Sequence, residues 1–410
     1  MQRTDNRAMK TIRLRAGRER SLLRRHPWIF DGAIERGGGD MGETVRVESQ
    51  GGEFLAWAAF SPNSAYRARV WSFEEAERID AAFFQRRVDA ALGMRQALAI
   101  ESDAMRLIHG ESDGLPGLVV DRYADTLVAQ FLSAGAQRWK GAISDALLKA
   151  TGIARLYERS DGNAREREGL AKAAGWLGPD AASLPQDSGP TEVLMHEHGW
   201  KFKVNIAQGH KTGFYLDQRE NRRKFASYVR SMGLRRILNC YCYSGGFSIA
   251  ALAGSQDAQV LSVDSSAPAL RQAQANLALN GWELPASQFL DADVNQQLRA
   301  FLAEGRLFDA IVLDPPKLAP TAAQAERAAR AYKDINRLAL QLLEPGGLLF
   351  TFSCSGGVDA ALFHKIVASA GADAGVDGYV LERLGGASDH PMTLSFPEGE
   401  YLKGLAVMRK

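Results

Sequence analysis

One cysteine stands where a nucleophile would be useful. Cys354 lies in the segment TFSCSGG at residues 351–357, directly after the apolar residues 348–350. The apolar run predicts a buried strand, and the small residues after it predict a loop at the carboxyl end of that strand. Open α/β sheets bind their ligands at this edge. We therefore predict a reactive thiol in a ligand site, and the alternative is a small core residue, as free cysteines often are.

Two further segments end predicted strands in the same half of the chain. Residues 238–247, with the sequence LNCYCYSGGF, end one strand and open a helix, and their glycines let a ligand approach the backbone. Residues 308–317, with the sequence FDAIVLDPPK, place Asp314 at the end of another strand. Because the carboxyl ends of parallel strands share one edge, we expect the three segments to lie close together.

Acidic residues end the two strands that follow the glycine-rich loop. Asp264 ends the predicted strand at 260–264, where its carboxylate can accept both ribose hydroxyls of a cofactor. Asp291 and Asp293 follow the next strand, where a carboxylate can meet an adenine amine. The loop lacks the G-x-G-x-x-G fingerprint, which argues against NAD.

The loop at 238–247 resembles the cofactor loop of class I S-adenosylmethionine (SAM) methyltransferases, and Asp314-Pro315-Pro316 resembles the element with which such enzymes hold a nucleobase. The resemblance implies SAM as cofactor. The residues that it implies for cofactor binding are Asn239, Tyr241, Ser244, Gly245, Gly246, Asp264, Asp291, Asp293 and Asp314. Residues 209–222 precede the first strand, and Phe214, Tyr215 and Asp217 there would form a lid over the methionine half, a ledge for RNA, or a helix cap.

The overall composition predicts a globular protein. At 410 residues with 46% apolar content, the chain should form ~2 to 3 domains with sizeable cores. No run approaches the ~20 apolar residues of a membrane span, and no apolar signal core follows the N-terminus, so we expect a cytoplasmic protein. Three cysteines do not suit a disulfide framework. Cys240 and Cys242 lack a second ligand pair nearby, so we expect no metal.

Positive charge gathers near the N-terminus. The net charge is only +2, but the first 30 residues hold nine basic and two acidic side chains. Such clustering is expected of a phosphate-binding surface, and the alternative is a solvated face. Residues 1–9 are expected to be a mobile arm. From Thr11 onward apolar residues alternate with the arginines, which predicts folded structure.

The chain divides into three predicted parts. Residues 10–76 are β-rich, with runs at 44–47, 54–60 and 68–71 between glycine turns and a helix, turn and strand at 21–30. Residues 77–190 predict a mixed α+β domain, with helices at 79–100 and 139–148. A Gly- and Pro-rich loop at 178–190 marks its end. Strands and helices alternate in residues 191–410, which predicts an α/β fold with a doubly wound, Rossmann-like sheet.

The whole arrangement resembles the ribosomal large subunit methyltransferase I family, which makes 5-methylcytosine in bacterial 23S ribosomal RNA. The motifs are RRHPW at 24–28 before an Asp-Gly turn, KTGFYLDQR at 211–219, DPPK at 314–317, YKDIN at 332–336 and FSCSG at 352–356. The resemblance implies a PUA-like RNA-binding domain at 10–76 and 23S ribosomal RNA as partner, with no membrane association and with a homodimer left open. It implies RNA contacts by Arg24, Arg25, Lys211, Arg219 and Lys317.

This family implies a specific chemistry. Carbon 5 of cytosine is a poor nucleophile, so a thiolate first adds at carbon 6, and Cys354 is the predicted nucleophile. Asp314 would hydrogen-bond the ring. Asp389, Glu398 and Glu400 are the candidates for the base that removes the carbon 5 proton. The chain lacks the second cysteine that the wider RNA cytosine methyltransferases carry after Asp-x-Pro. The alternatives are a guanine or exocyclic-amine methyltransferase and a non-catalytic, RNA-binding ribosome-assembly factor.

Overall fold

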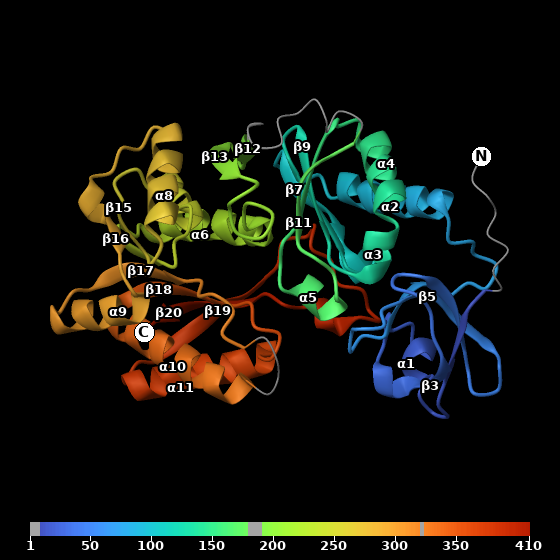
Figure 1. Ribbon diagram of the computed structural model, residues 1–410. Helices are drawn as coiled ribbons and strands as arrows, with labels where there is room; N and C mark the ends of the chain where they lie inside the picture. Colours follow the sequence, from blue (N-terminus) through green and yellow to red (C-terminus); the bar gives the residue numbers. More distant parts are fainter. Residues whose placement is uncertain (1–8, 179–190, 320–323) are drawn as a thin grey trace. The chain divides into compact units, whose positions relative to one another are not determined.

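The computed structural model describes residues 9–178, 191–319 and 324–410, which form two compact units (Figure 1). The first unit comprises Met1–Met195, Val204–Phe214 and Ser388–Gly399, and the second comprises His196–Lys203, Tyr215–Ala387 and Glu400–Lys410. The first unit thus holds both N-terminal domains predicted from the sequence. The boundary predicted between them, at residues 76 and 77, stays a prediction. Residues 1–8 of the predicted arm at 1–9, and nearly all of the predicted loop at 178–190, lie outside the described residues.

The β-rich part of the first unit contains a six-stranded sheet in the order β2-β6-β5-β4-β1-β3. Alternating burial along β1 and β4 shows why these residues form strands, since every second side chain enters the core. The elements are β1 (Thr11–Leu14), α1 (Arg20–Leu23), β2 (Trp28–Ile29), the 3-10 turn η1 (Asp31–Ala33), β3 (Ile34–Gly37), β4 (Thr44–Glu48), β5 (Phe54–Phe60) and β6 (Ala68–Ser72).

The remainder of the first unit is built on a five-stranded sheet in the order β11-β10-β9-β8-β7. Helices α2 and α4 pack against it through an apolar core of Phe, Leu, Ile and Val side chains. The elements are α2 (Ala81–Ala97), β7 (Ala104–His109), η2 (Gly110–Asp113), β8 (Leu118–Tyr123), β9 (Thr126–Phe131), α3 (Ala134–Arg138), α4 (Lys140–Thr151), β10 (Arg155–Ser160), α5 (Ala164–Glu168) and β11 (Ala173–Leu177). A separate two-stranded sheet joins β12 (Glu192–Glu197) and β13 (Trp200–Asn205).

The second unit is the predicted doubly wound sheet, with seven strands in the order β16-β15-β14-β17-β18-β20-β19. The first five strands are parallel, and β20 runs antiparallel to both of its neighbours. The strands are β14 (Arg236–Cys240), β15 (Gln259–Asp264), β16 (Phe289–Asp291), β17 (Phe308–Leu313), β18 (Leu343–Ser353), β19 (Gly378–Gly385) and β20 (Lys403–Arg409).

Helices cover both faces of this sheet (Figure 1). One face carries α6 and α8, and the other carries α9, α10 and α11. Local caps fix where several helices begin, because the side chains of Ser266, Asp293 and Asp359 accept the amides of the first turns of α8, α9 and α11. The helices are α6 (Arg219–Met232), α7 (Gly246–Gly254), α8 (Ala267–Leu279), α9 (Val294–Ala303), α10 (Ala325–Leu342) and α11 (Ala360–Ala374), with 3-10 turns η4 (Leu216–Gln218), η5 (Ala286–Gln288) and, in the first unit, η7 (Pro397–Gly399).

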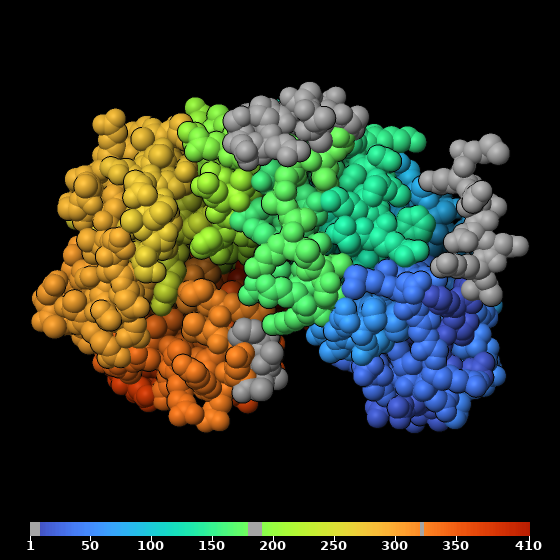
Figure 2. Space-filling model, in the orientation of Figure 1, coloured from blue at the N-terminus to red at the C-terminus, as the bar shows by residue number. Residues whose placement is uncertain are grey.

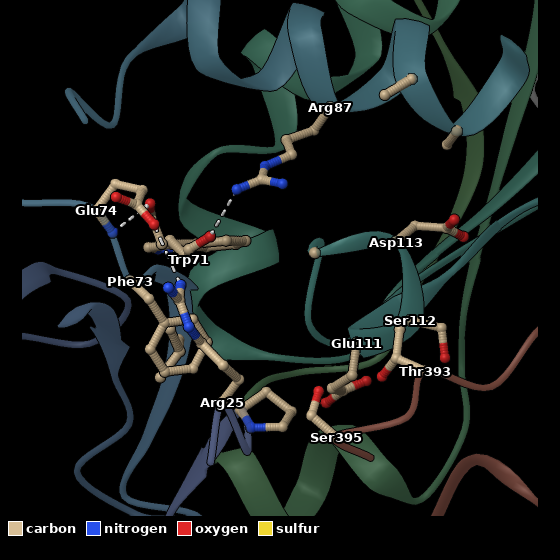
Figure 3. A pocket seen from close by; sticks show the side chains of 16 residues that line it. Arg25, Trp71, Phe73, Glu74, Arg87, Glu111, Ser112, Asp113, Thr393 and Ser395 are labelled. Atoms are coloured by element: carbon tan, nitrogen blue, oxygen red, sulfur yellow. Dashed lines mark hydrogen bonds and ion pairs between the residues drawn. The ribbon is translucent and has the colours of Figure 1, made fainter. Parts of the chain in front are cut away.

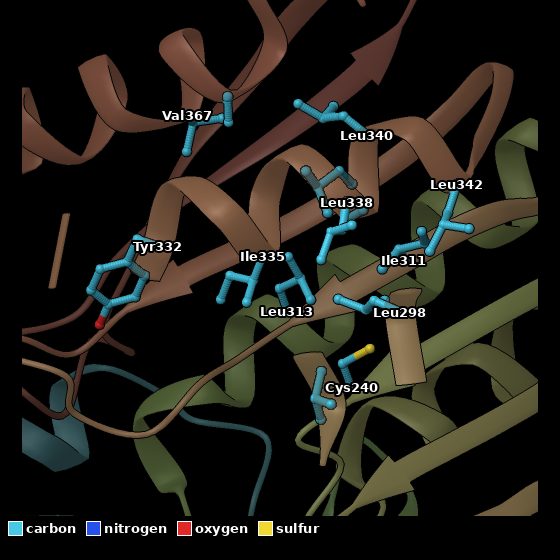
Figure 4. Packing of buried hydrophobic residues seen from close by; sticks show 14 of the residues in the cluster. Cys240, Leu298, Ile311, Leu313, Tyr332, Ile335, Leu338, Leu340, Leu342 and Val367 are labelled. Atoms are coloured by element: carbon cyan, nitrogen blue, oxygen red, sulfur yellow. The ribbon is translucent and has the colours of Figure 1, made fainter. Parts of the chain in front are cut away.

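The main core of the second unit lies between the sheet and α9, α10 and α11 (Figure 4). Side chains from β14 and β17 meet those of α10 there, among them Ile311, Leu313, Ile335 and Leu338. Cys240 belongs to this cluster and is 1% exposed. The space-filling view shows the side chains of the unit filling the gaps between its ribbons (Figure 2).

Most of the strands of the second unit follow the predicted order, but several elements were not predicted, among them β10, β11, α6, α9 and β19. Strand β10 carries the buried charges Glu158 and Arg159, so its sequence lacks the apolar pattern of a core strand. Glu158 pairs with Lys140, and Arg159 pairs with Asp161 at 3.0 Å and donates to the Ile206 carbonyl at 2.9 Å. Strand β19 is an edge strand with exposed apolar side chains, which no core pattern distinguishes from a loop.

No helix among the described residues is both long and apolar enough to span a membrane.

Candidate active site

The three segments singled out from the sequence leave neighbouring strands at one edge of the sheet. Cys240 at the end of β14 pairs with Leu313 at the end of β17, and Leu313 pairs in turn with Thr351 of β18. The loops that begin at residues 241 and 314 therefore start at the same level, and the loop at 354 begins after β18 has continued two residues further along the same edge. This is the carboxyl edge, where parallel α/β sheets bind ligands.

The thiol of Cys354 lies beside the Asp-Pro-Pro loop. Its Sγ is 4.0 Å from the carbonyl oxygen of Pro315, and the side chain is partly exposed. The next residue fixes this approach, because the buried Ser355 Oγ accepts the amides of Leu318 and Ala319 at 3.1 and 2.9 Å. The loops after β17 and β18 are thus held together on either side of the thiol.

Helix α10 supports the same serine. The Tyr332 hydroxyl lies 2.9 Å from Ser355 Oγ, and both side chains are buried. Burial raises the pKa of Tyr332, so its hydroxyl keeps its proton and its hydrogen-bonding role at physiological pH. Tyr332 opens the predicted YKDIN motif, and its contact gives that motif a structural function at the site.

Two residues of η4, Asp217 and Gln218, form side-chain hydrogen bonds with residues near the site. The Asp314 carboxylate accepts a hydrogen bond of 3.0 Å from Gln218 Nε2, and Gln218 Oε1 accepts one of 2.6 Å from Asn221. The Asp217 carboxylate accepts a hydrogen bond of 2.6 Å from the Tyr401 hydroxyl. Gln218 therefore helps to hold the Asp314 carboxylate in one orientation.

Tyr215 contributes an aromatic side chain beside the cofactor loop. Its ring meets that of Tyr243 edge to face, with centroids 5.4 Å apart. Burial raises the pKa of Tyr215 well above its ordinary value, and the negative charge of Asp314 adds to the effect. The phenol therefore stays neutral, so it can pack against a ligand or hydrogen-bond with it, but it cannot serve as a base.

The glycine-rich loop within 238–247, which is predicted to bind the cofactor, has an unusual backbone that Asp264 holds in place. Tyr241 and Tyr243 have φ values of 58° and 47°, in the left-handed region that side chains other than glycine rarely adopt. The Asp264 carboxylate accepts the amides of Tyr243 at 2.9 Å and Ser266 at 3.0 Å. A carboxylate offers about four acceptor positions, so two remain for ribose hydroxyls. Such strain concentrates at functional sites.

Position 246 must be a glycine because the side chain of a buried, ion-paired arginine fills the space beside it. A Cβ at this position would lie 2.9 Å from Cδ of Arg222, which makes two hydrogen bonds of 2.6 Å with Glu197 and one of 3.0 Å with the Tyr215 carbonyl. The arginine side chain occupies the space beside the start of α7, so only glycine fits there.

Asn239 and Ser244, both predicted to bind cofactor, are buried. Asn239 donates a 2.8 Å hydrogen bond to Ser248 of α7, so it ties the strand to the following helix. Ser244 Oγ has no hydrogen-bond partner within the described residues. A buried hydroxyl without a partner is costly, and a bound ligand would satisfy it.

The two carboxylates predicted to meet adenine differ in their surroundings. Asp291 is exposed and pairs in register with Asp264 on the neighbouring strand. Asp293 caps α9 through the Gln296 amide at 2.9 Å. Asp291 therefore lies on the same strand edge as the predicted ribose acceptor.

Three thiols occur in the second unit, and only that of Cys354 is accessible. Cys240 and Cys242 are 1% and 6% exposed, and burial raises the pKa of both. A thiol must ionise to act as a nucleophile. No group of three or more His, Cys, Asp or Glu in the described ranges could hold a metal ion.

Two other predicted site residues have their contacts in the first unit. Phe214 is buried, and its amide donates to the Tyr123 hydroxyl at 3.2 Å. Asp389 is fully buried, with one carboxylate oxygen accepting the Arg106 amide at 2.8 Å and the other 2.9 Å from His390 Nδ1. Both oxygens of Asp389 are therefore engaged in holding the segment 388–399 within that unit.

The other two base candidates are more exposed. Glu398 belongs to the first unit, and its carboxylate lies 3.3 Å from His26 Nε2. Glu400 is an exposed residue of the second unit, three positions before β20.

The residues predicted to contact RNA also differ in exposure. Arg24, Arg25, Lys211 and Lys317 are exposed. Arg219 is completely buried, with its Nε 3.1 Å from Glu220, which argues against the RNA contact predicted for it.

Arg25 borders a cavity of about 550 Å³ in the first unit (Figure 3). Its guanidinium lies over the Phe73 ring and pairs with Glu74 at 3.2 Å. Arg87 reaches toward the cavity from α2. The lining also holds the acidic residues Glu74, Glu111 and Asp113, of which Glu74 pairs with Arg25 and Asp113 with Arg95.

Comparison with known proteins agrees with this geometry. Residues 12–73 match the PUA-like domain family, and residues 175–392 match the S-adenosylmethionine-dependent methyltransferases. The chain is 46% identical over 401 residues to ribosomal RNA large subunit methyltransferase I of Photobacterium profundum, covering 97% of this chain and 98% of the relative. The chain belongs to the ribosomal RNA large subunit methyltransferase I family. The relative from Salmonella enteritidis is 47% identical over 397 residues, which is 96% of each chain.

Two solved structures share the fold over nearly the whole length. A proposed SAM-dependent methyltransferase from Streptococcus mutans is 19% identical with a TM-score of 0.81, covering 98% of this chain and 100% of that one. A proposed methyltransferase solved with SAH covers the same shares at a TM-score of 0.82 and 19% identity. The predicted PUA-like module, the class I methyltransferase fold and SAM as cofactor are thus confirmed.

We predict that Asp264→Ala weakens SAM binding. The substitution removes the predicted ribose acceptor and the support of two loop amides, and a charged hydrogen bond contributes about 1.5–3 kcal/mol. The dissociation constant, measured by calorimetry, should rise on the order of tenfold to a hundredfold. The exposed Asp377, changed to alanine, is the control. An unchanged affinity in Asp264→Ala would place the cofactor elsewhere.

We further predict that reversing Arg24 and Arg25 to glutamate weakens RNA binding and flattens its salt dependence. Each lost phosphate contact lowers the slope of log affinity against log salt by about 0.9. Filter binding at several salt concentrations measures the slope, and SAM affinity should not change. Arg78→Glu, at a highly exposed arginine of the same unit, is the control. A slope that stays constant would show that the two arginines are only a solvated face.

Proposed function

We propose that this SAM-dependent methyltransferase methylates carbon 5 of a cytosine in 23S ribosomal RNA through a covalent adduct with Cys354. The observation that carries the proposal is the position of its Sγ, 4.0 Å from Pro315 O in the loop that follows Asp314. The curated relatives are named as ribosomal RNA large subunit methyltransferases, which supports the substrate class.

The reaction begins with the addition of the Cys354 thiolate to carbon 6 of the cytosine. The new S–C bond makes carbon 5 enolate-like and therefore nucleophilic. Carbon 5 must be nucleophilic to attack the methyl group of SAM. The Asp314 carboxylate accepts a hydrogen bond from the exocyclic amine of the ring and so orients the base for attack at carbon 6. Gln218 holds this carboxylate in position. SAM, when bound, supplies the methyl group as an electrophilic sulfonium.

Release requires a base that removes the carbon 5 proton, so that the S–C bond can break and the thiolate can leave. We assign this role to Glu400. Asp389 has both carboxylate oxygens engaged, and Glu398 lies beside His26, whereas Glu400 is exposed in the same unit as Cys354. An exposed carboxylate has the acceptor capacity that proton abstraction needs.

Exposed basic residues away from the reacting atoms bind the phosphates of the RNA backbone. Arg24 and Arg25 belong to the part that matches the PUA-like domain family, and Lys317 follows the Asp-Pro-Pro element. Phosphate contacts position the RNA without reading its sequence.

A competing function is methylation of an exocyclic amine on the same fold. Enzymes of that kind usually place an aromatic residue after the two prolines to stack the base, and this chain has the exposed Lys317 there. Amine methylation would also leave the accessible thiol of Cys354, beside the Asp-Pro-Pro loop, without a function. A non-catalytic assembly factor would bind SAM and RNA but transfer no methyl group.

We predict that 23S RNA with 5-fluorocytosine at the target traps a covalent protein–RNA species. The fluorine leaves no removable proton at carbon 5, so the adduct cannot resolve and survives denaturing electrophoresis. Cys354→Ala should lose the adduct and turnover but keep SAM binding. Cys240→Ala and Cys242→Ala are the matched controls and should keep the adduct. Robust methylation by Cys354→Ala would move the assignment to amine or ring-nitrogen chemistry.

We predict that Glu400→Gln accumulates the methylated adduct on ordinary cytosine. Without the base, addition and methyl transfer still proceed but release slows, and general base catalysis contributes roughly 10²–10⁴-fold. Denaturing electrophoresis with labelled SAM detects the labelled adduct. Glu398→Gln is the comparison variant. Accumulation in Glu398→Gln and not in Glu400→Gln would assign the base to Glu398 instead.

A further inference from the structure

A buried lysine lies next to the proposed nucleophile, and the sequence motifs did not single it out. Lys403 begins β20 and is 3% exposed. Its Nζ donates hydrogen bonds of 2.8 Å to the Ser355 carbonyl and 2.9 Å to the Tyr401 carbonyl. Within the described parts of the chain, no carboxylate lies within ion-pair distance of this ammonium group.

The antiparallel register explains how Lys403 reaches this position. Lys403 pairs with Ser353, the last residue of β18, so it stands opposite the point where the Cys354 loop leaves the sheet. Its side chain then contacts the carbonyl of the residue that follows the cysteine. The lysine and the thiol are therefore attached to the same short segment, Ser353 to Ser355.

Burial of a lysine in this way is costly. An ammonium group loses its hydration, and two carbonyl partners do not neutralise its charge. Burial accordingly lowers the pKa of Lys403, while the negative charge of Cys354, the next largest influence, raises it. A methionine would fill a similar volume without this cost, so the retained charge calls for a function rather than a packing role.

We propose that Lys403 is a positioning residue that holds the Cys354 loop and keeps Cys354 ionised as the attacking thiolate. In this role the ammonium group keeps its proton and the thiol proton leaves to solvent, so no bond between the two side chains forms or breaks. The positive charge stabilises the thiolate across a poorly hydrated interior, where electrostatic interactions are stronger than in water. This inference rests on the proposed function, in which the thiolate is the nucleophile.

The test measures the pH dependence of Cys354 alkylation by iodoacetamide in the full-length protein. Only the thiolate reacts, and mass spectrometry of the Cys354 peptide separates it from the buried Cys240 and Cys242. The variants are Lys403→Met, which removes both charge and donors, and Lys403→Gln, which removes the charge but keeps an N–H donor. Lys410→Met, at the far end of β20 and paired with Asp377, is the matched control.

In both Lys403 variants we expect the midpoint of the alkylation profile to rise by about 1 pH unit or more. A nearby opposite charge changes the pKa of an ionisable group by about this amount. The alkylation rate at neutral pH should fall about tenfold. Lys410→Met should keep the wild-type profile. If Lys403→Gln also keeps the wild-type midpoint, the lysine acts only through its hydrogen bonds and the proposal is overturned. Thermal unfolding and SAM binding show whether each variant is folded.

This assay uses no RNA, so it can fail independently of the proposed function. An unshifted midpoint in folded Lys403→Met, together with a normal wild-type adduct on 5-fluorocytosine RNA, would overturn the role of Lys403 alone. Absence of the adduct in the wild-type protein would overturn the proposed function, whatever the alkylation profile.

Discussion

The shared register of three parallel strands is the constraint on which this site depends. Because β14, β17 and β18 end side by side, the loops that follow them meet at one edge of the sheet, although more than a hundred residues separate the first from the last. Ser355 then converts this proximity into a fixed geometry, since its hydroxyl joins the loop after β17 to the loop after β18 and to α10. The position of the Cys354 thiol follows from these few bonds.

Polar groups around the site, of which Arg222, Glu197 and Lys403 are buried and Asp264 is partly exposed, act mainly on the backbone. Asp264 holds two amides of the cofactor loop, Arg222 and Glu197 fill the space beside Gly246, and Lys403 holds two carbonyls near the nucleophile. Each such group loses hydration on burial, and each recovers part of that free energy through charge-assisted hydrogen bonds. These groups support the strained backbone at Tyr241 and Tyr243 and the segment that carries Cys354, whose geometry the apolar core alone would not specify.

The antiparallel strand β20 adds a contribution that a purely parallel sheet would lack. It returns along β18 and so brings residues from near the C-terminus back to the carboxyl edge. Tyr401 and Lys403 enter the site in this way, one on the Asp217 carboxylate and the other on the Ser355 carbonyl. The segment 388–399 that precedes this strand belongs to the first unit, where Asp389 is held by a backbone amide and a histidine.

The sequence by itself determined the α/β class, and it placed the glycine-rich loop at 238–247, Asp264 and Cys354 at the ends of predicted strands, while their roles at the site stay predictions. Each of these depends on local signals, namely apolar runs that end in glycine, aspartate or cysteine. Tertiary structure decided the rest. Lys403 resembles any other lysine at the start of a strand until pairing with Ser353 places it at the edge, and Arg219 resembles an RNA contact until packing buries it. Burial and long-range pairing depend on residues far apart in the chain, so no local pattern could reveal either role.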